Sequence, residues 1–224
     1  MDLDVEESRV RAVIFDLDGV ICDTEPLHVI SWRILFAKRG IEVPEAYLKT
    51  GIGITDLEFL RTFFEHYDIK GDPNLWQLEK RNIYLGLLQH KVPEFPGAVA
   101  LVKRLYWNWP LGLASSSWRI SIETITRRLA IRRHFAAIIG KEDVTEHKPS
   151  PEPFLAAAAE LEIDPVRCAV IEDSIAGIEA AKGAGMLCIA VTNSYTADKL
   201  SDADLIVTSL EDAAPILSLL SVGP

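Results

Sequence analysis

The chain has 224 residues, a length that predicts one or two domains with a hydrophobic core. Its 49% hydrophobic and 25% charged residues are ordinary for a globular protein, and its net charge of −10 argues against a nucleic-acid-binding surface, which would need clustered lysine and arginine. No apolar stretch approaches the ~20 residues of a membrane span, and the acidic start "MDLDVEESRV" lacks the layout of a secretory signal, so we expect a cytoplasmic protein that binds neither nucleic acid nor membrane.

Short apolar runs predict the strands of a parallel sheet that is covered on both faces by helices. Helix-length segments separate the later runs. One covers residues 150–163, with Ser150 as the expected N-cap, and another covers 174–186 and is expected to end at Gly183 and Gly185. This alternation predicts a doubly wound, Rossmann-like α/β fold. The expected strands lie at 10–16, 111–115, 136–140, 168–173, 187–192 and 204–208.

An insertion interrupts this alternation between the first two strands. About 95 residues separate them, whereas a βαβ unit needs only ~30. The intervening sequence has no convincing strand, and its apolar spacing predicts three helices, over 25–40, 56–68 and 74–90. We therefore expect an all-helical subdomain over 25–92 and an α/β core formed by 1–24 and 93–224. A further helix over 98–109 returns the chain to the sheet.

The residues that follow the predicted strands are the candidates for a functional site, because ligands bind at the carboxyl ends of an open parallel sheet. Carboxylates gathered at one edge are unfavourable unless a cation is present or one of them is protonated. Mg²⁺ prefers oxygen ligands and keeps waters and substrate phosphates in its shell. The sequence therefore predicts a Mg²⁺ site formed by Asp16, Asp173, the backbone carbonyl of Asp18 and, directly or through water, Glu172.

A phosphate bound to that metal would meet a serine hydroxyl and the free N–H groups of a helix N-terminus. Among the three serines after the second strand we place Ser115 first, ahead of Ser116 and then Ser117, since each can instead cap a helix. Lys148 would add a compact positive charge. Asp16 would then attack phosphorus to form an aspartyl-phosphate, and Asp18 would exchange protons with the leaving alcohol and the attacking water.

Four segments closely resemble the four motifs of the haloacid dehalogenase (HAD) superfamily, in its branch of phosphatases and β-phosphoglucomutase-like enzymes. They are "FDLDGV", "LASSS", "KPSPEPF" and "VIEDSIAGIEAAKGAG", in that order. The insertion is similar to the helical cap of that branch. The resemblance implies a nucleophile at Asp16, an acid/base at Asp18, phosphate holders at Ser115 and Lys148, and a magnesium ligand at Asp173 with Glu172 beside it.

Asp18 and the first loop of the predicted cap bear on which reaction is catalysed. Asp18 favours phosphoryl transfer, since a dehalogenase expels a halide that needs no proton. The β-phosphoglucomutase group grips a distal phosphate with an arginine of the first cap loop, where this chain has the aliphatic segment Gly51–Ile54. We therefore expect a Mg²⁺-dependent phosphatase that hydrolyses a small phosphomonoester, such as a sugar phosphate, through an aspartyl-phosphate. The alternatives are a β-phosphoglucomutase-like mutase, with Lys49 or Arg61 in place of that arginine, and a non-catalytic phosphate-sensing or partner-binding protein.

The remaining expectations concern the helical subdomain and the surroundings of the site. His28, on its first helix, is a candidate substrate contact, with a satisfied interfacial histidine as the equal alternative. We interpret Arg81 as an ordinary exposed charge and Ser174 as a helix N-cap. Glu172 has helix capping as its alternative role. The expected partner is a small phosphorylated metabolite, and the expected assembly is a monomer or weak dimer.

Overall fold

The computed structural model describes residues 10–51 and 54–222. The chain divides into two compact units. The core unit comprises Met1–Asp23 and Pro93–Pro224, and the cap unit comprises Thr24–Val92. Each unit has its own secondary structure and is described by itself below.

The core unit contains a six-stranded parallel sheet with the strand order β3-β2-β1-β4-β5-β6. This confirms the predicted doubly wound α/β fold. The chain winds outward from β1 in one direction and from β4 in the other, so the order reverses between these two central strands. In such sheets the crevice beside the reversal is where ligands bind. The strands are β1 (Ala12–Phe15), β2 (Leu111–Ala114), β3 (Phe135–Ile139), β4 (Cys168–Glu172), β5 (Leu187–Val191) and β6 (Leu205–Val207).

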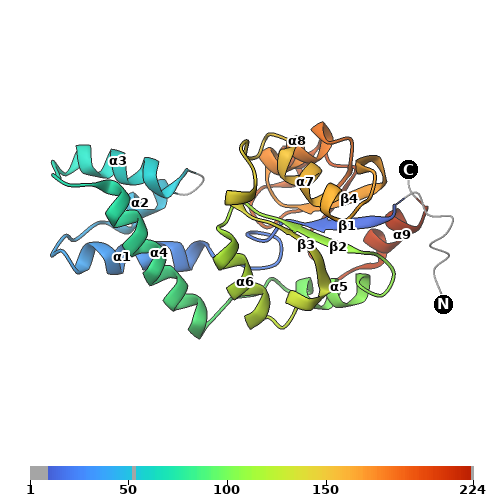
Figure 1. The fold of residues 1–224 in the computed structure, drawn as a ribbon, viewed down its shortest axis with the longest axis horizontal. Helices are drawn as coiled ribbons and strands as arrows, with labels where there is room; N and C mark the ends of the chain where they lie inside the picture. Colours follow the sequence, from blue (N-terminus) through green and yellow to red (C-terminus); the bar gives the residue numbers. More distant parts are fainter. Residues whose placement is uncertain (1–9, 52–53, 223–224) are drawn as a thin grey trace. The chain divides into compact units, whose positions relative to one another are not determined.

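Helices cover both faces of the sheet, with α7 and α8 above it and α5 and α9 below it in Figure 1. Every residue of β1, β2, β4 and β5 is buried, as expected for strands covered on both faces. Alanines of α7 and α8 pack into the same buried cluster as strand residues, and these small side chains allow the helices to lie close to the sheet. The helices of the core are α5 (Ala98–Leu105), α6 (Arg119–Arg128), α7 (Glu152–Glu160), α8 (Ile175–Gly183) and α9 (Ala214–Val222).

Two predicted helix ends in the core need correction. Helix α7 has Pro151 as its N-cap, not Ser150, whose hydroxyl instead accepts a hydrogen bond from the Glu152 N–H at 3.3 Å. Helix α5 ends at Leu105, four residues before the predicted end. The chain then turns so that Trp109 is buried and its indole donates to the carbonyl of Val10. Tertiary contacts of this tryptophan therefore end the helix earlier than the local pattern indicates.

The cap unit is a helical bundle around a cluster of aromatic side chains. It contains the three predicted helices, as α1 (Glu25–Ala37), α3 (Asp56–His66) and α4 (Pro73–His90), together with a short helix α2 (Glu45–Leu48) that the sequence pattern did not reveal. Phe36 and Phe63 stack with their ring centroids 4.1 Å apart, and Trp32 stacks on Phe36. Burial of these large rings is the main source of stability in a unit this small.

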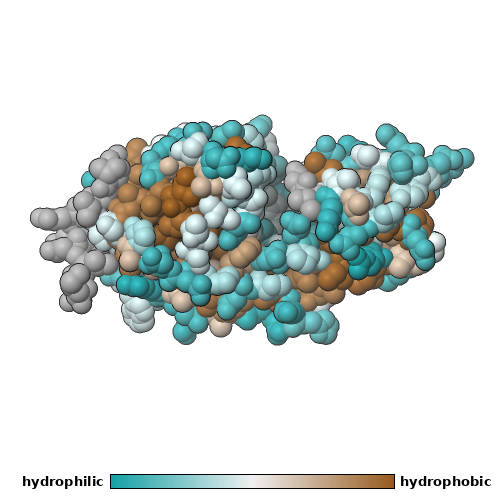
Figure 2. All heavy atoms as spheres, turned by 180° about the vertical axis from the view of Figure 1, so that it is seen from behind, coloured by the Kyte–Doolittle hydropathy of each residue, from teal (hydrophilic) through white to brown (hydrophobic). Residues whose placement is uncertain are grey.

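The surface mixes hydrophilic residues with local hydrophobic patches, as the space-filling view in Figure 2 shows. Among the large exposed hydrophobic residues are Trp107 in the core unit and Leu75 in the cap unit. Within the described part of the chain, every helix is too short or too polar to cross a membrane.

Candidate active site

The carboxylates that follow β1 and β4 meet at one edge of the sheet. These strands are neighbours, with Phe15 paired to Ile171, so the residues directly after them lie side by side. One carboxylate oxygen from each of Asp16, Glu172 and Asp173 lies within 4.8 Å of the others. All three side chains are buried. The predicted acidic cluster therefore contains these three carboxylates, whereas the carboxylate of Asp18 is not part of it.

Lys148 supplies the positive charge of this cluster. Its Nζ donates to Asp16 Oδ1 at 2.5 Å and to Glu172 Oε1 at 2.6 Å. Only 8% of the Lys148 side chain is exposed. One ammonium group thus faces three buried carboxylates, which leaves the site with an excess of negative charge.

Burial and the neighbouring charges together shift the pKa values of the groups in this cluster. Burial raises the pKa of Asp173 to about 7, and the nearby Glu172 carboxylate adds to this effect. Burial also raises the pKa of Asp16 well above its ordinary value, although Lys148 opposes the change. Burial alone would lower the pKa of Lys148, but Asp16 and Glu172 outweigh it and keep the ammonium charged. The site therefore favours binding of either a proton or a metal cation.

Glu172 is anchored on both of its carboxylate oxygens. One accepts from Lys148, and the other accepts from the backbone N–H groups of Asp173 and Ser174, both at 2.7 Å. Burial opposes ionisation, but Lys148 and these N–H groups hold the pKa of Glu172 below its usual value. Ser174 is the N-cap of α8, as predicted, and donates to the same oxygen of Glu172. A side chain at Gly177 would overlap the Glu172 carboxylate, so this close approach requires glycine.

Asp18 is held by two serines of the turn after β2. Ser117 Oγ donates to Asp18 Oδ2 at 2.8 Å and Ser115 Oγ donates to the same oxygen at 3.1 Å. The Ser115 hydroxyl also accepts from the Ser117 N–H at 3.0 Å. Ser116 is exposed. The sequence reasoning ranked Ser117 last, but the turn brings Ser115 and Ser117, two residues apart, to the same side.

Sequence reasoning missed two residues that follow β5. Asn193 Nδ2 donates to the carbonyl of Gly19 at 2.7 Å, and Ser194 Oγ donates to Asp173 Oδ2. The rule that identified the other candidates also applies here, because "TNS" is a polar run directly after a predicted strand.

A second buried lysine lies in the cap unit, where it contacts the candidate residue His28. Lys80 Nζ donates to Asp56 Oδ1 at 2.8 Å and to His28 Nδ1 at 2.6 Å, and 1% of the lysine side chain is exposed. Burial, followed by the charge of Lys80, lowers the pKa of His28 well below its ordinary value. Since Nδ1 of this neutral imidazole accepts from the ammonium, its proton resides on Nε2.

Lys80 was not among the residues singled out from the sequence, where its neighbour Arg81 was considered instead. The position of Lys80 on its helix could have identified it as a buried residue. On α4, Lys80 lies four residues after Trp76 and four before Tyr84, within the stripe that packs inward. A lysine on the apolar stripe of a helix calls for a carboxylate partner, which is the partly buried Asp56 here.

The cap unit has a hollow of about 180 Å³ next to this group. Its described lining residues include two carboxylates and neither lysine nor arginine. Ile54 lies in this lining, while Ile52 and Gly53 of the first cap loop lie outside the described residues. Lys49, considered as a substitute for the arginine of mutases, pairs with Glu45 at 3.0 Å. The lining residues are Glu25, His28, Val29, Trp32, Leu48, Gly51, Ile54 and Asp56.

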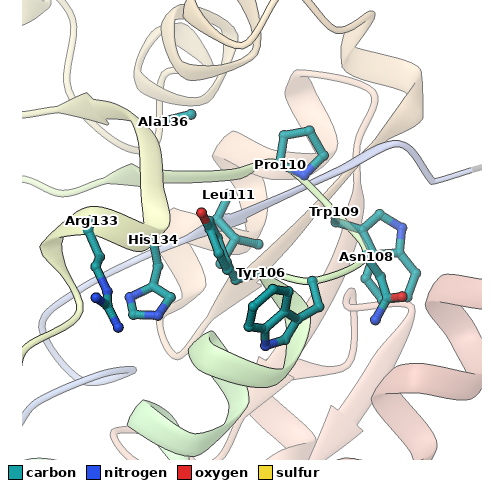
Figure 3. Close-up of a pocket in the computed structure, with 9 residues that line it drawn as sticks. Tyr106, Asn108, Trp109, Pro110, Leu111, Arg133, His134 and Ala136 are labelled. Carbon is teal, nitrogen blue, oxygen red and sulfur yellow. The ribbon is translucent and has the colours of Figure 1, made fainter.

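A larger hollow of about 560 Å³ lies in the core unit at the amino ends of β2 and β3 (Figure 3). Its lining includes Trp107, which is 82% exposed, and the imidazole of His134 beside Arg133. None of its described lining residues is a carboxylate. Because parallel strands carry the acidic cluster at their other ends, this hollow is separate from the candidate active site.

The geometry agrees with the family to which the sequence is similar. The model of a family described as haloacid dehalogenase-like hydrolase matches residues 13–191, which include most of β1, the strands β2 to β5 and the whole cap unit. The chain belongs to this family. The predicted superfamily and the prediction of an HAD-like hydrolase enzyme are thereby confirmed.

Individual members of the HAD family that are similar to this chain include phosphatases and mutases. The fructose-1-phosphate phosphatase YqaB of Escherichia coli is 30% identical over 80% of this chain and 94% of its own length. The β-phosphoglucomutase of Bacillus subtilis is 35% identical, with 91% of both chains covered. The crystal structure of β-phosphoglucomutase from Clostridium difficile superimposes with a TM-score of 0.78 at 30% identity, covering 95% of this chain and 97% of that one.

Proposed function

We propose that this HAD-family enzyme is a Mg²⁺-dependent phosphatase that hydrolyses a small phosphomonoester, such as a sugar phosphate. The observation that carries the proposal is the buried cluster of Asp16, Glu172 and Asp173, which Lys148 neutralises only in part. Relatives that act on fructose 1-phosphate and phosphoglycolate support a small phosphorylated metabolite as the substrate.

The donor set fits a hard divalent cation. All three side chains offer oxygen, the ligand that Mg²⁺ prefers. Burial and then the neighbouring Glu172 carboxylate raise the pKa of Asp173, so a bound cation would stabilise its ionised form. Asp16 and Asp173 would hold the ion, with the backbone carbonyl of Asp18 as a further ligand and Glu172 binding directly or through water. When bound, Mg²⁺ supplies Lewis-acid polarisation of the phosphoryl group and neutralises its charge.

The protein side chains account for the two chemical steps. Asp16 attacks phosphorus and forms an aspartyl-phosphate, while Asp18 gives a proton to the departing alcohol. Asp18 then takes a proton from water, which attacks the aspartyl-phosphate and releases inorganic phosphate. The hydroxyls of Ser115 and Ser117 orient the Asp18 carboxylate for both transfers. Lys148 offsets the negative charge that accumulates as Asp16 approaches the phosphoryl oxygens.

The cap unit supports a phosphatase over a phosphosugar mutase. A cap that grips a second phosphate needs a cation that is not already neutralised. Among the described residues of the cap hollow are Glu25 and Asp56, and the nearby Lys80 is paired with Asp56. A mutase remains the second candidate, favoured by the 35% identity to the β-phosphoglucomutase of B. subtilis over nearly the whole chain.

Hydrolysis of p-nitrophenyl phosphate tests the chemistry. We expect turnover that requires Mg²⁺, stops with EDTA and falls by at least about 10³-fold in Asp16→Asn, which keeps the size of the side chain and removes the nucleophile. The matched control is Asp212→Asn, a change beyond the motifs near the start of α9, which should leave turnover unchanged. Equal activity of wild type and Asp16→Asn would refute the proposed nucleophile.

A panel of phosphorylated metabolites tests the reaction type. A phosphatase releases inorganic phosphate from one or more hexose phosphates, whereas a mutase converts β-glucose 1-phosphate to glucose 6-phosphate without net release. Isomerisation in the absence of phosphate release from any compound of the panel would replace the phosphatase with the mutase.

A further inference from the structure

The loop after β5 begins at the sheet edge where the acidic cluster lies, with Glu172 and Asp173 at the end of β4 and Asp16 at the end of β1. In the sheet order β5 is next to β4, which carries Glu172 and leads to Asp173, and β4 is next to β1, which leads to Asp16. The loop itself is attached to the sheet, since the Thr192 N–H donates to the carbonyl of Val207. Its next two residues therefore start from a fixed position at the edge where the carboxylates gather.

The two loop side chains contact one group from each neighbouring segment. Asn193 Nδ2 donates to the carbonyl of Gly19 at 2.7 Å, on the turn after β1. Ser194 Oγ donates to Asp173 Oδ2, after β4. Gly19 has a φ of +90°, and a side chain there would overlap the Asp173 carboxylate. The turn after β1 and the Asp173 carboxylate are thus packed against each other, and the loop after β5 is bonded to both.

We propose that Asn193 and Ser194 are positioning residues, which fix the Asp173 carboxylate and the Asp18–Gly19 turn in the geometry that binds the metal. The inference rests on the proposed Mg²⁺ site. The serine hydroxyl uses one oxygen of Asp173 and so fixes the rotation of the carboxylate. Asn193 holds the peptide next to Asp18, whose carbonyl is a proposed ligand. Groups that orient metal ligands in this way typically contribute 10- to 100-fold in metal affinity.

Mg²⁺ binding, measured by calorimetry on the metal-free full chain, tests this inference directly. Ser194→Ala is expected to raise the dissociation constant about 10-fold, and Asn193→Ala is expected to raise it as well. Ser194→Thr keeps the hydroxyl and should restore the affinity of the wild type. The matched control is Ser221→Ala, which removes a hydroxyl that donates to Leu217 within α9, away from the site.

Two further measurements distinguish a role of Ser194 in positioning the metal ligands from a role in the stability of the fold. The thermal midpoint in EDTA should be nearly the same for Ser194→Ala and wild type. In a phosphatase assay, Ser194→Ala should need more Mg²⁺ for half-maximal activity and recover its kcat at saturating Mg²⁺. Unchanged Mg²⁺ affinity in both Ser194→Ala and Asn193→Ala would overturn this inference and leave the proposed function standing. A lower thermal midpoint in EDTA without a change in Mg²⁺ affinity would do the same. Failure of the wild type to bind Mg²⁺ would overturn the proposed function with it.

Discussion

A buried lysine lies in the core unit and another lies in the cap unit, and the two lysines have opposite surroundings. Lys148 in the core donates to two carboxylates, with a third nearby. Lys80 in the cap has one carboxylate partner and a neutral imidazole. The core carboxylates hold the pKa of Lys148 above its ordinary value, whereas burial lowers the pKa of Lys80 despite the opposing charge of Asp56.

This difference distinguishes a reactive site from a structural one. The core cluster has more carboxylates than ammonium groups, so it gains from a further cation. The cap cluster balances one ammonium with one carboxylate. Aromatic rings also surround the lysine, with Lys80 Nζ 4.9 Å from the ring centroid of Trp32 and 5.4 Å from that of Tyr84. We therefore expect changes in the core to respond to Mg²⁺ and changes in the cap to affect stability without such a response.

Lys148→Met should have the largest effect. It leaves three buried carboxylates without their cation and is expected to cost roughly 3–5 kcal/mol of unfolding free energy in EDTA, with partial recovery in Mg²⁺. Loss of its charge beside the phosphoryl group should also lower kcat by about 10²-fold or more. Urea unfolding with and without Mg²⁺ measures the first effect. Lys103→Met, at an exposed lysine on α5, is the control, and equal stability of the two variants would contradict the prediction.

Lys80→Met should destabilise the cap by roughly 2 kcal/mol, with no recovery in Mg²⁺. The expected cost is smaller than at Lys148 because the remaining carboxylate, Asp56, is 28% exposed and partly hydrated. Urea unfolding followed by tryptophan fluorescence, to which Trp32 and Trp76 of this unit contribute, measures the effect. Lys38→Met removes an exposed partner of Glu79 and should change the unfolding free energy by less than about 0.5 kcal/mol. If Mg²⁺ restored the unfolding free energy of Lys80→Met, the proposed difference between Lys80 and Lys148 would be wrong.

The pKa of Asp173 predicts a smaller, pH-dependent effect in the core. Its folded-state pKa of about 7 lies above the ordinary value of 3.8, so its contribution to stability is complete below about pH 4 and is lost as the pH rises through 7. The metal-free protein should lose on the order of 1 kcal/mol of unfolding free energy from this group between pH 6 and pH 8. Mg²⁺ should remove that loss, because the ion replaces the proton.

Thermal unfolding at several pH values, with EDTA or with Mg²⁺, measures this effect. Asp173→Asn should make the metal-free profile less steep between pH 6 and pH 8, with Asp16 accounting for any remaining slope, and should abolish the stabilisation by Mg²⁺. A wild-type profile that stays as steep in Mg²⁺ as in EDTA would show that another group is responsible.

Ser117→Ala should have the smallest effect. It removes the hydrogen bond from Ser117 Oγ to the Asp18 carboxylate, which is worth about 1 kcal/mol or about fivefold in kcat. Ser116→Ala is the matched control, since this neighbouring side chain is exposed and should leave kcat unchanged. A larger loss at Ser116 than at Ser117 would support the order of importance that the sequence alone indicated.

The sequence was most informative where one local rule was sufficient. Strands buried on both faces appear as short apolar runs, so all six were predicted within one or two residues of their observed bounds. The rule that ligands bind at the carboxyl ends of parallel strands then identified Asp16, Glu172 and Asp173. It was less informative for short elements such as α2, whose four residues are too few to show a helical period.

Partners that are far apart in the chain required the structure. The pairing of Lys80 with Asp56 and His28 spans 24 and 52 positions, and the bond from Asn193 to Gly19 spans 174. Periodicity identifies which side of a helix faces inward, but it contains no information about which buried polar group another helix supplies.

The sequence by itself determined the doubly wound sheet, the helical insertion and the residue types of the acidic cluster. The reason is that the spacing of apolar residues and the positions of strand ends depend on residues that are neighbours in the chain. Only the tertiary structure decided which carboxylates share a cation, which serines hold Asp18, and that the loop after β5 reaches both Gly19 and Asp173. These contacts depend on strand order and side-chain packing, in which residues distant in sequence come within hydrogen-bonding distance.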